Sequence, residues 1–102
     1  MTPAAQLRQL IDEGKLVTAP GAPDALTARL VEQAGFPAVY MTGFGATATR
    51  LGAPDVGLLT QTEMCAHARA MSQAVSVPII ADADTGYGGP HNIRRTVDEY
   101  VQ

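Results

Sequence analysis

Apolar residues recur along the first forty positions with two spacings, one typical of helices and one typical of short strands. Apolar side chains three or four residues apart, such as Leu7 and Leu10, indicate helices, whereas short apolar runs indicate strands. Gly14 follows the first helical pattern, as glycines commonly do at helix C-termini. The pattern predicts a helix over 3–13, a strand over 16–18 broken by a Pro20-Gly21 turn, a helix capped by Asp24 with its stripe at Leu26 and Leu30, and a strand over 38–41.

The second half of the chain contains a long glycine-containing segment followed by a well-marked helix. Residues 42–59 are predicted to form one loop, and loops of this length in compact domains are commonly functional or mobile. Thr60 and Glu63 form a capping-box pattern at the start of the next helix. The nearly continuous apolar run 77–81 predicts a third strand covered on both faces. A last helix begins at Pro90, and its inward face is predicted to consist of Ile93, Val97 and Val101.

Strands and helices alternate along the chain, without the pattern of an antiparallel hairpin. This alternation is typical of an α/β fold in which parallel strands are joined by right-handed helical crossovers. Three parallel strands alone would leave two unpaired sheet edges, so the pattern predicts that further strands complete the sheet. The 102 residues are therefore expected to form an incomplete part of a single domain.

The composition narrows the functional classes. With 46% hydrophobic and 17% charged residues, the chain is too apolar to be a disordered tail. Its formal net charge of −3 is the opposite of the basic surface that marks nucleic-acid binders. No stretch approaches the roughly 18 apolar residues of a membrane span, and the single cysteine, Cys65, cannot form an internal disulfide. We expect a cytoplasmic, enzyme-like protein without nucleic-acid or membrane partners, in which Cys65 packs within a helix.

Aspartates follow the third predicted strand. Asp82 and Asp84 are two residues apart, a spacing that places both carboxylates on one side of a strand. Two such groups repel each other unless a cation lies between them, and hard oxygen ligands favour Mg²⁺ or Mn²⁺. Alternatively, one carboxylate caps the following loop and the other is solvated. Asp55 in the 42–59 segment adds a third carboxylate, for which turn formation is the alternative role.

The glycine-containing segment 42–48 allows two interpretations. It resembles the dinucleotide-binding fingerprint G-x-G-x-x-A, which requires a helix to start immediately and an acidic residue at the end of the next strand. Gly52, with a proline two residues later, is expected to break any such helix. The favoured interpretation is an oxyanion hole formed by the backbone N–H groups of Gly43 and Phe44 with the Thr42 hydroxyl.

The two histidines carry no comparable pattern. His67 and His91 have no partners at catalytic spacing, so surface or helix-start positions are expected for both.

Four separated segments together resemble the isocitrate lyase and phosphoenolpyruvate mutase superfamily in order and spacing. They are PGAPDA at 20–25, YMTG at 40–43, LGAPDVG at 51–57 and ADADTGYG at 81–88. The resemblance implies a (β/α)8 TIM barrel of the phosphoenolpyruvate-binding type. Residues 1–102 would form only its lead-in helix and first three βα units, as the N-terminal part of one domain.

The resemblance also implies roles for particular residues. Asp82 would contact Mg²⁺ (or Mn²⁺) directly, while Asp84 and Asp55 would hold it through water. The implied substrate-binding residues are Tyr40, Thr42, Gly43 and Phe44. Thr42 replaces the serine that is usual in the superfamily, and the bulk of Phe44 favours a small ligand such as oxaloacetate.

The implied reaction is cleavage of a bond next to a ketone in a small 2-oxo carboxylate, through a metal-stabilised enolate. Oxaloacetate decarboxylation, (2-methyl)isocitrate cleavage and phosphonomutase chemistry remain alternatives, and a homotetramer is implied for an intact protein. The acid-base loop of the superfamily is expected beyond Gln102, so no catalytic acid or base is assigned. The other hypothesis is a fragment or partial barrel that associates or binds ligand without catalysis of its own.

Overall fold

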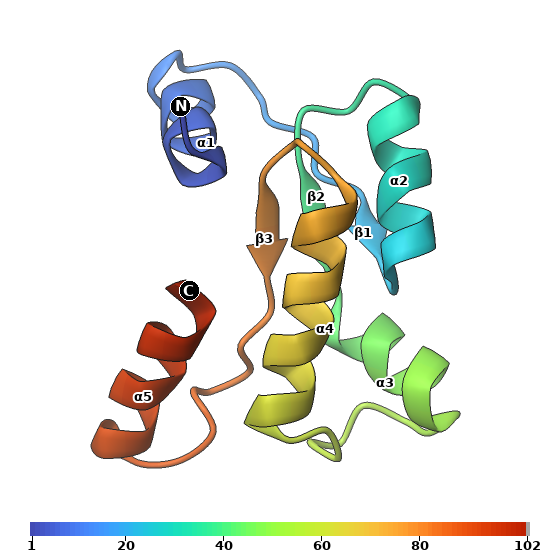
Figure 1. Cartoon of the computed structure of the whole chain (residues 1–102), viewed down its shortest axis with the longest axis vertical. Coiled ribbons are helices and arrows are strands. Elements are labelled where there is room, and N and C mark those ends of the chain that lie inside the picture. The colour runs from blue at the N-terminus through green and yellow to red at the C-terminus, as the bar shows by residue number, and fades with distance from the viewer. Residues whose placement is uncertain (102) are drawn as a thin grey trace.

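The computed structural model describes residues 1–101, in which helices and short strands alternate except where two helices follow each other before the third strand (Figure 1). In chain order the elements are α1 (Pro3–Asp12), β1 (Gly21–Ala22), α2 (Ala25–Gln33), β2 (Val39–Met41), α3 (Gly43–Leu51), α4 (Gln61–Ala74), β3 (Ile79–Ala81) and α5 (Pro90–Val101). None of the helices within these residues is both long and apolar enough to cross a membrane.

The strands form one parallel sheet in the order β1-β2-β3, which confirms the α/β class. Along β2 the side chains of Val39 and Met41 are fully buried, whereas Tyr40 between them is 37% exposed. Successive side chains of a strand point to opposite faces, so the core lies on the face covered by α2 and α4. Tyr40 is in register with Ile80 on the other face.

The first strand lies later in the chain than its local pattern predicts. Residues 16–18 are not a strand, and Leu16 is 92% exposed. Instead, Gly21–Ala22 pairs with β2, and the Tyr40 N–H donates to the Pro20 carbonyl at 3.0 Å. The expected Pro20-Gly21 turn is therefore wrong, because pairing with β2 determines which residues become the strand.

The predicted loop over 42–59 is wrong in its first half, where the chain forms α3. Thr42 caps this helix, because its hydroxyl oxygen accepts the Gly45 N–H at 3.1 Å. Gly52 ends the helix in the left-handed conformation, with φ of +60°. Burial of Ala46 and Thr47 stabilises the helix despite its two glycines, which illustrates how packing outweighs local propensity.

Several apolar stripes face outward rather than inward. In α2 the buried residue is Ala28 instead of Leu26 and Leu30. In α5 the buried residue is Thr96, whereas the predicted stripe of Ile93, Val97 and Val101 is exposed, Val101 by 80%. Ile80 of β3 is also exposed, so the expectation of cover on both faces is wrong for the described chain. None of these exposed residues belongs to the buried core of the described chain.

The helix ends agree with their sequence signals. Asp24 caps α2, and Thr60 and Glu63 form the predicted capping box at the start of α4. Leu59 and Met64, which flank that box, both belong to the buried core. Gly14 follows α1 with φ of +72°, as a helix-ending glycine does.

Acid is expected to weaken the α2 cap. The backbone N–H of Thr27 donates to the Asp24 carboxylate at 2.8 Å, and this bond is the main reason that the pKa of Asp24 lies below its usual value. The stabilisation is thus present above the unfolded pKa of about 3.9 and is lost as pH falls through the lower folded pKa. Asp24→Ala is expected to reduce the free energy of unfolding by about 1 kcal/mol near neutral pH.

Chemical denaturation of the chain at pH 7 and pH 3 checks this expectation. Asp24→Asn keeps an acceptor without a titrating carboxylate, so it should lose less stability between the two pH values than the unmodified chain. Thr2→Ala removes the α1 cap, which has no ionisable group, and its effect should be the same at both pH values. An equal acid sensitivity of Asp24→Asn and the unmodified chain would contradict the assignment.

Candidate metal and carboxylate site

Three aspartates from two separate loops line one pocket at the C-terminal edge of the sheet. Asp82 follows β3 directly, Asp84 lies in the 82–89 loop, and Asp55 comes from the segment between α3 and α4. The pocket has a volume of about 30 Å³ and Gly43 also lines it. Among residues 1–101, no three His, Cys, Asp or Glu side chains converge closely enough to ligate one ion together. The geometry therefore suits at most one or two direct carboxylate ligands, with the others acting at longer range.

The carboxylate of Asp82 is held by two backbone N–H groups. The Gly43 N–H donates to Oδ2 at 3.2 Å, and the Asp84 N–H donates to Oδ1 at 2.8 Å. A Cβ atom placed on Gly43 would collide with the Asp82 carboxylate. A glycine is thus required where the first turn of α3 meets the acid.

The 82–89 loop is a tight turn rather than a continued strand. β3 ends at Ala81, and Asp84 and Tyr87 have φ of +50° and +63°. Aspartate tolerates the left-handed region, whereas a positive φ is unusual for a bulky tyrosine. Strained residues of this kind cluster at functional sites, so the loop conformation is a second indication, besides the aspartates, that this segment belongs to a functional site. Asp82 and Asp84 share a pocket because of this turn and not because of strand alternation.

Helix α5 supports the loop through two side chains one turn apart. The Thr96 hydroxyl donates to the Gly86 carbonyl at 2.7 Å, and the Tyr100 hydroxyl donates to the Asp82 carbonyl at 3.1 Å. Burial, together with the neighbouring Tyr87, raises the pKa of Tyr100, so its hydroxyl stays protonated as a donor. Sequence reasoning missed both residues, although their i, i+4 spacing is a signal for a shared helix face.

The predicted substrate-binding residues surround the first turn of α3. Gly43 lines the pocket with the aspartates, whereas Tyr40, Thr42 and Phe44 are not among the residues that line it. Burial and the charges of Asp82 and Asp55 raise the pKa of Tyr40. Phe44 is 65% exposed.

Hydrogen bonds within the chain already use part of the predicted oxyanion hole. The Thr42 oxygen accepts from Gly45, which leaves its hydroxyl hydrogen available, and the Gly43 N–H is directed at Asp82. The Gly43 N–H would have to leave Asp82, or be shared with it, before it could serve a substrate oxyanion.

The structure supports a dinucleotide-binding fingerprint at 42–48 in one respect and opposes it in another. A helix does begin immediately at Gly43, contrary to the expectation that Gly52 would prevent it. However, the separate helix α4 precedes the next strand, and the Gly43 N–H faces the carboxylate of Asp82. A phosphate at this position would meet a negative charge, so the fingerprint is incomplete.

His67 and His91 have different environments. His67 is buried in the middle of α4, with Nε2 2.6 Å from the Pro23 carbonyl oxygen, so its predicted surface position is wrong. The fold brings together residues 44 positions apart, which no local spacing reveals. His91 is exposed at the start of α5, as expected.

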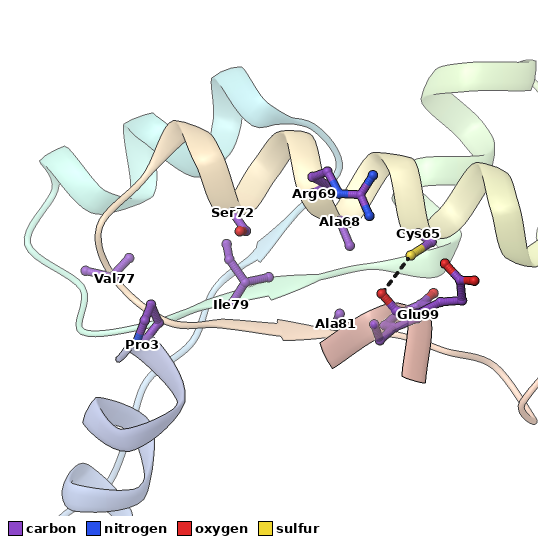
Figure 2. Close-up of a pocket in the computed structure, with 10 residues that line it drawn as sticks. Pro3, Cys65, Ala68, Arg69, Ser72, Val77, Ile79, Ala81 and Glu99 are labelled. Carbon is purple, nitrogen blue, oxygen red and sulfur yellow. Dashed lines mark hydrogen bonds between the residues drawn. The ribbon is translucent and has the colours of Figure 1, made fainter. Parts of the chain in front are cut away.

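Cys65 has a packing role. It is buried in α4, and its Sγ lies 3.4 Å from the Glu99 carbonyl oxygen, to which the thiol donates (Figure 2). It lines a separate cavity of about 200 Å³ between α4, β3 and α5, together with Arg69 and Ser72. None of the three aspartates lines this cavity, so it is distinct from the site described above.

The fold and the pocket define an α/β protein with carboxylates at the C-terminal end of a parallel sheet. Residues 7–102 match the phosphoenolpyruvate phosphomutase family, and the chain belongs to this family. The superfamily resemblance of the four sequence segments is thereby confirmed.

The comparison with individual proteins gives the same family. A 2,3-dimethylmalate lyase of Eubacterium barkeri is 57% identical over 100 residues, covering 98% of this chain and 35% of that protein. An oxaloacetate decarboxylase of Bradyrhizobium sp. (strain ORS 278) is 40% identical over 93 residues, covering 91% and 32%. A solved phosphonopyruvate hydrolase in complex with oxalate and Mg²⁺ matches with a TM-score of 0.94 and 39% identity, over 99% of this chain and 35% of that chain. The chain spans about a third of the length of the curated relatives it matches.

Proposed function

We propose that the protein uses Mg²⁺ to cleave a carbon–carbon bond in a small 2-oxo or 2-hydroxy carboxylate. The first candidate is decarboxylation of the 2-oxo acid oxaloacetate, and the second is retro-aldol cleavage of the 2-hydroxy acid (2-methyl)isocitrate, which releases a 2-oxo acid. The observation that carries the proposal is the pocket that Asp55, Asp82 and Asp84 share with the first turn of α3. Decarboxylation breaks a carbon–carbon bond, releases CO2 and leaves the electron pair as an enolate, which is then protonated. Such chemistry needs positive charge and hydrogen-bond donors where the oxyanion develops.

The donor set at the pocket fits a hard divalent cation. In the proposal Asp82 contacts Mg²⁺ or Mn²⁺ directly, while Asp55 and Asp84 hold the ion through water, which agrees with the absence of three converging ligands among residues 1–101. When bound, the cation stabilises negative charge on the substrate oxygen as a Lewis acid. The relative solved with oxalate and Mg²⁺ supports this assignment.

The proposed substrate-binding residues are Tyr40, Thr42, Gly43 and Phe44. The hydroxyls of Tyr40 and Thr42 are donors that suit a carboxylate or an enolate oxygen, and the raised pKa of Tyr40 keeps its proton in place. Phe44 follows Gly43 on the first turn of α3, and its backbone N–H is the other backbone donor of the proposed oxyanion hole. The relatives named for oxaloacetate and 2,3-dimethylmalate support a four-carbon dicarboxylate skeleton.

The proposal also places the three-stranded sheet within a (β/α)8 TIM barrel. The support is a TM-score of 0.94 over 99% of this chain against a chain of which it covers 35%. Residues 1–102 would supply the lead-in helix and the first three βα units of that domain. A homotetramer and a cytoplasmic location remain predictions.

Mg²⁺-dependent turnover tests the proposed reaction. Oxaloacetate is incubated with Mg²⁺ and either this chain or a longer protein that contains it, and CO2 release is compared with the same buffer without protein. The proposal predicts release above background from the longer protein, abolished by excess EDTA. Its activity remaining after Mg²⁺ removal would contradict the proposal, as would inactivity toward both candidate substrates.

A binding role without catalysis is the second candidate for the chain by itself. The side chains that line the pocket include carboxylates and Tyr87, but no histidine, lysine or cysteine of the described chain. The chain would then bind oxalate in the presence of Mg²⁺ without releasing CO2 from oxaloacetate. Calorimetric titration with oxalate, alongside the turnover assay, separates this candidate from catalysis.

A further inference from the structure

One buried side chain outside the carboxylate pocket contacts two neighbouring elements at once. His67, on α4, is 8% exposed, and its Nε2 lies 2.6 Å from the carbonyl oxygen of Pro23, just before α2. Its Nδ1 lies 3.5 Å from Nη1 of Arg50, near the end of α3. The imidazole therefore bridges the entry to α2 and the last turn of α3.

The chemistry of the two partners assigns the tautomer. A carbonyl oxygen only accepts hydrogen bonds, so Nε2 of His67 carries the proton that is donated to Pro23. The guanidinium of Arg50 only donates, so Nδ1 is the acceptor, at the long limit of a hydrogen bond. Both ring nitrogens are thus used in bonds that hold neighbouring elements.

Pro23 in turn packs against the first turn of α3. A Cβ atom on Gly45 would lie 2.9 Å from Cβ of Pro23, so the proline ring occupies the space that a larger residue would need. The Gly45 N–H donates to Thr42, the cap of the same helix. The contacts run from His67 through Pro23 to the turn that carries Thr42 and Gly43.

We propose that His67 is a positioning residue for the carboxylate-binding turn of α3. It fixes Pro23 against the start of the helix and Arg50 near its end, so the helix cannot slide along its axis without breaking one contact. The inference rests on the proposed function, because it names the turn holding Thr42 and Gly43 as the element that binds the substrate carboxylate. His67 touches no substrate in this role.

The test compares two substitutions of nearly the same shape. His67→Gln retains an amide N–H that can donate to Pro23, whereas His67→Met keeps a similar length and helix preference but has no donor. Oxalate affinity in the presence of Mg²⁺ is measured by calorimetry for both variants, with His91→Gln as the exposed control. We expect His67→Met to weaken oxalate binding about tenfold or more, as loss of an outer partner at a binding site does. His67→Gln should stay within a few-fold of the unmodified chain.

A second readout separates this inference from the proposed function. In the free chain, amide hydrogen exchange at Gly45 and Ala46 should accelerate in His67→Met relative to Ser72 and Gln73 of α4, and His67→Gln should restore the protection. If the unmodified chain binds no oxalate, the binding role proposed for the chain by itself fails, and this exchange pattern still decides the role of His67. Equal behaviour of the Met and Gln variants in both measurements would overturn the inference. A ¹⁵N spectrum showing the proton on Nδ1 would also overturn it.

Discussion

Asp82→Asn is expected to weaken Mg²⁺ binding by about 100-fold or more. Loss of an outer-shell partner commonly costs 10- to 100-fold in metal affinity, and Asp82 is the proposed direct ligand. The asparagine amide would also direct an N–H₂ group toward the backbone N–H of Gly43 or Asp84, each of which now donates to a carboxylate oxygen. Calorimetric titration of the chain with Mg²⁺ measures the affinity, and urea denaturation measures the accompanying loss of stability.

Asp98→Asn is the matched control for this substitution. Asp98 is exposed on α5 and the same negative charge is removed, so any general effect of net charge on cation binding appears in both variants. The affinity of Asp98→Asn for Mg²⁺ should remain close to that of the unmodified chain. If the two substitutions weaken Mg²⁺ binding equally, Asp82 is not a specific ligand.

Gly43→Ala is expected to disrupt the site without removing any polar group. The added Cβ would collide with the Asp82 carboxylate, so either the carboxylate or the first turn of α3 must move. Overpacking of this kind commonly costs about 1–3 kcal/mol of stability. Displacement of Asp82 from the Gly43 N–H should also reduce Mg²⁺ affinity about 10- to 100-fold. Urea denaturation and Mg²⁺ titration of the same variant measure the two effects.

Gly89→Ala is the control for Gly43→Ala. Gly89 lies at the end of the 82–89 loop, which also contains Asp82 and Asp84. A Cβ atom on Gly89 would meet its nearest neighbour, Oδ1 of Asn92, only at 4.0 Å, which is an ordinary contact distance. This variant should therefore bind Mg²⁺ normally. An unchanged Mg²⁺ affinity in Gly43→Ala would show that the close approach of α3 to Asp82 is not required for the site.

Local signals in the sequence predict the helix ends better than the strand and helix positions. The caps at Asp24 and Thr60 are formed by residues three apart, so a short pattern contains the whole interaction. β1 and α3 depend instead on distant partners: Gly21 pairs with Tyr40, and the first turn of α3 is fixed by Asp82. Local spacing contains no information on these contacts, which explains why the strand predicted at 16–18 and the first half of the loop predicted over 42–59 are wrong.

The same contrast between local patterns and distant contacts applies to the candidate site, which is predictable only in part. The aspartates stand out because parallel strands deliver residues such as Asp82 to one edge of the sheet, where α/β proteins place their sites. The supporting residues did not stand out, because Tyr100 and His67 act through carbonyl groups 18 and 44 positions away. Only the folded chain brings such partners together.

Paramagnetic relaxation would locate the one divalent cation that Asp55, Asp82 and Asp84 are proposed to share. Substoichiometric Mn²⁺ is added to the ¹⁵N-labelled chain, and the broadening of each amide resonance is measured and then reversed with excess Mg²⁺. We expect broadening centred on Gly43, Asp55 and the 82–87 loop, and recovery of these resonances when Mg²⁺ is added. Broadening centred on another acidic residue, such as Glu63 or Asp98, would contradict the shared site.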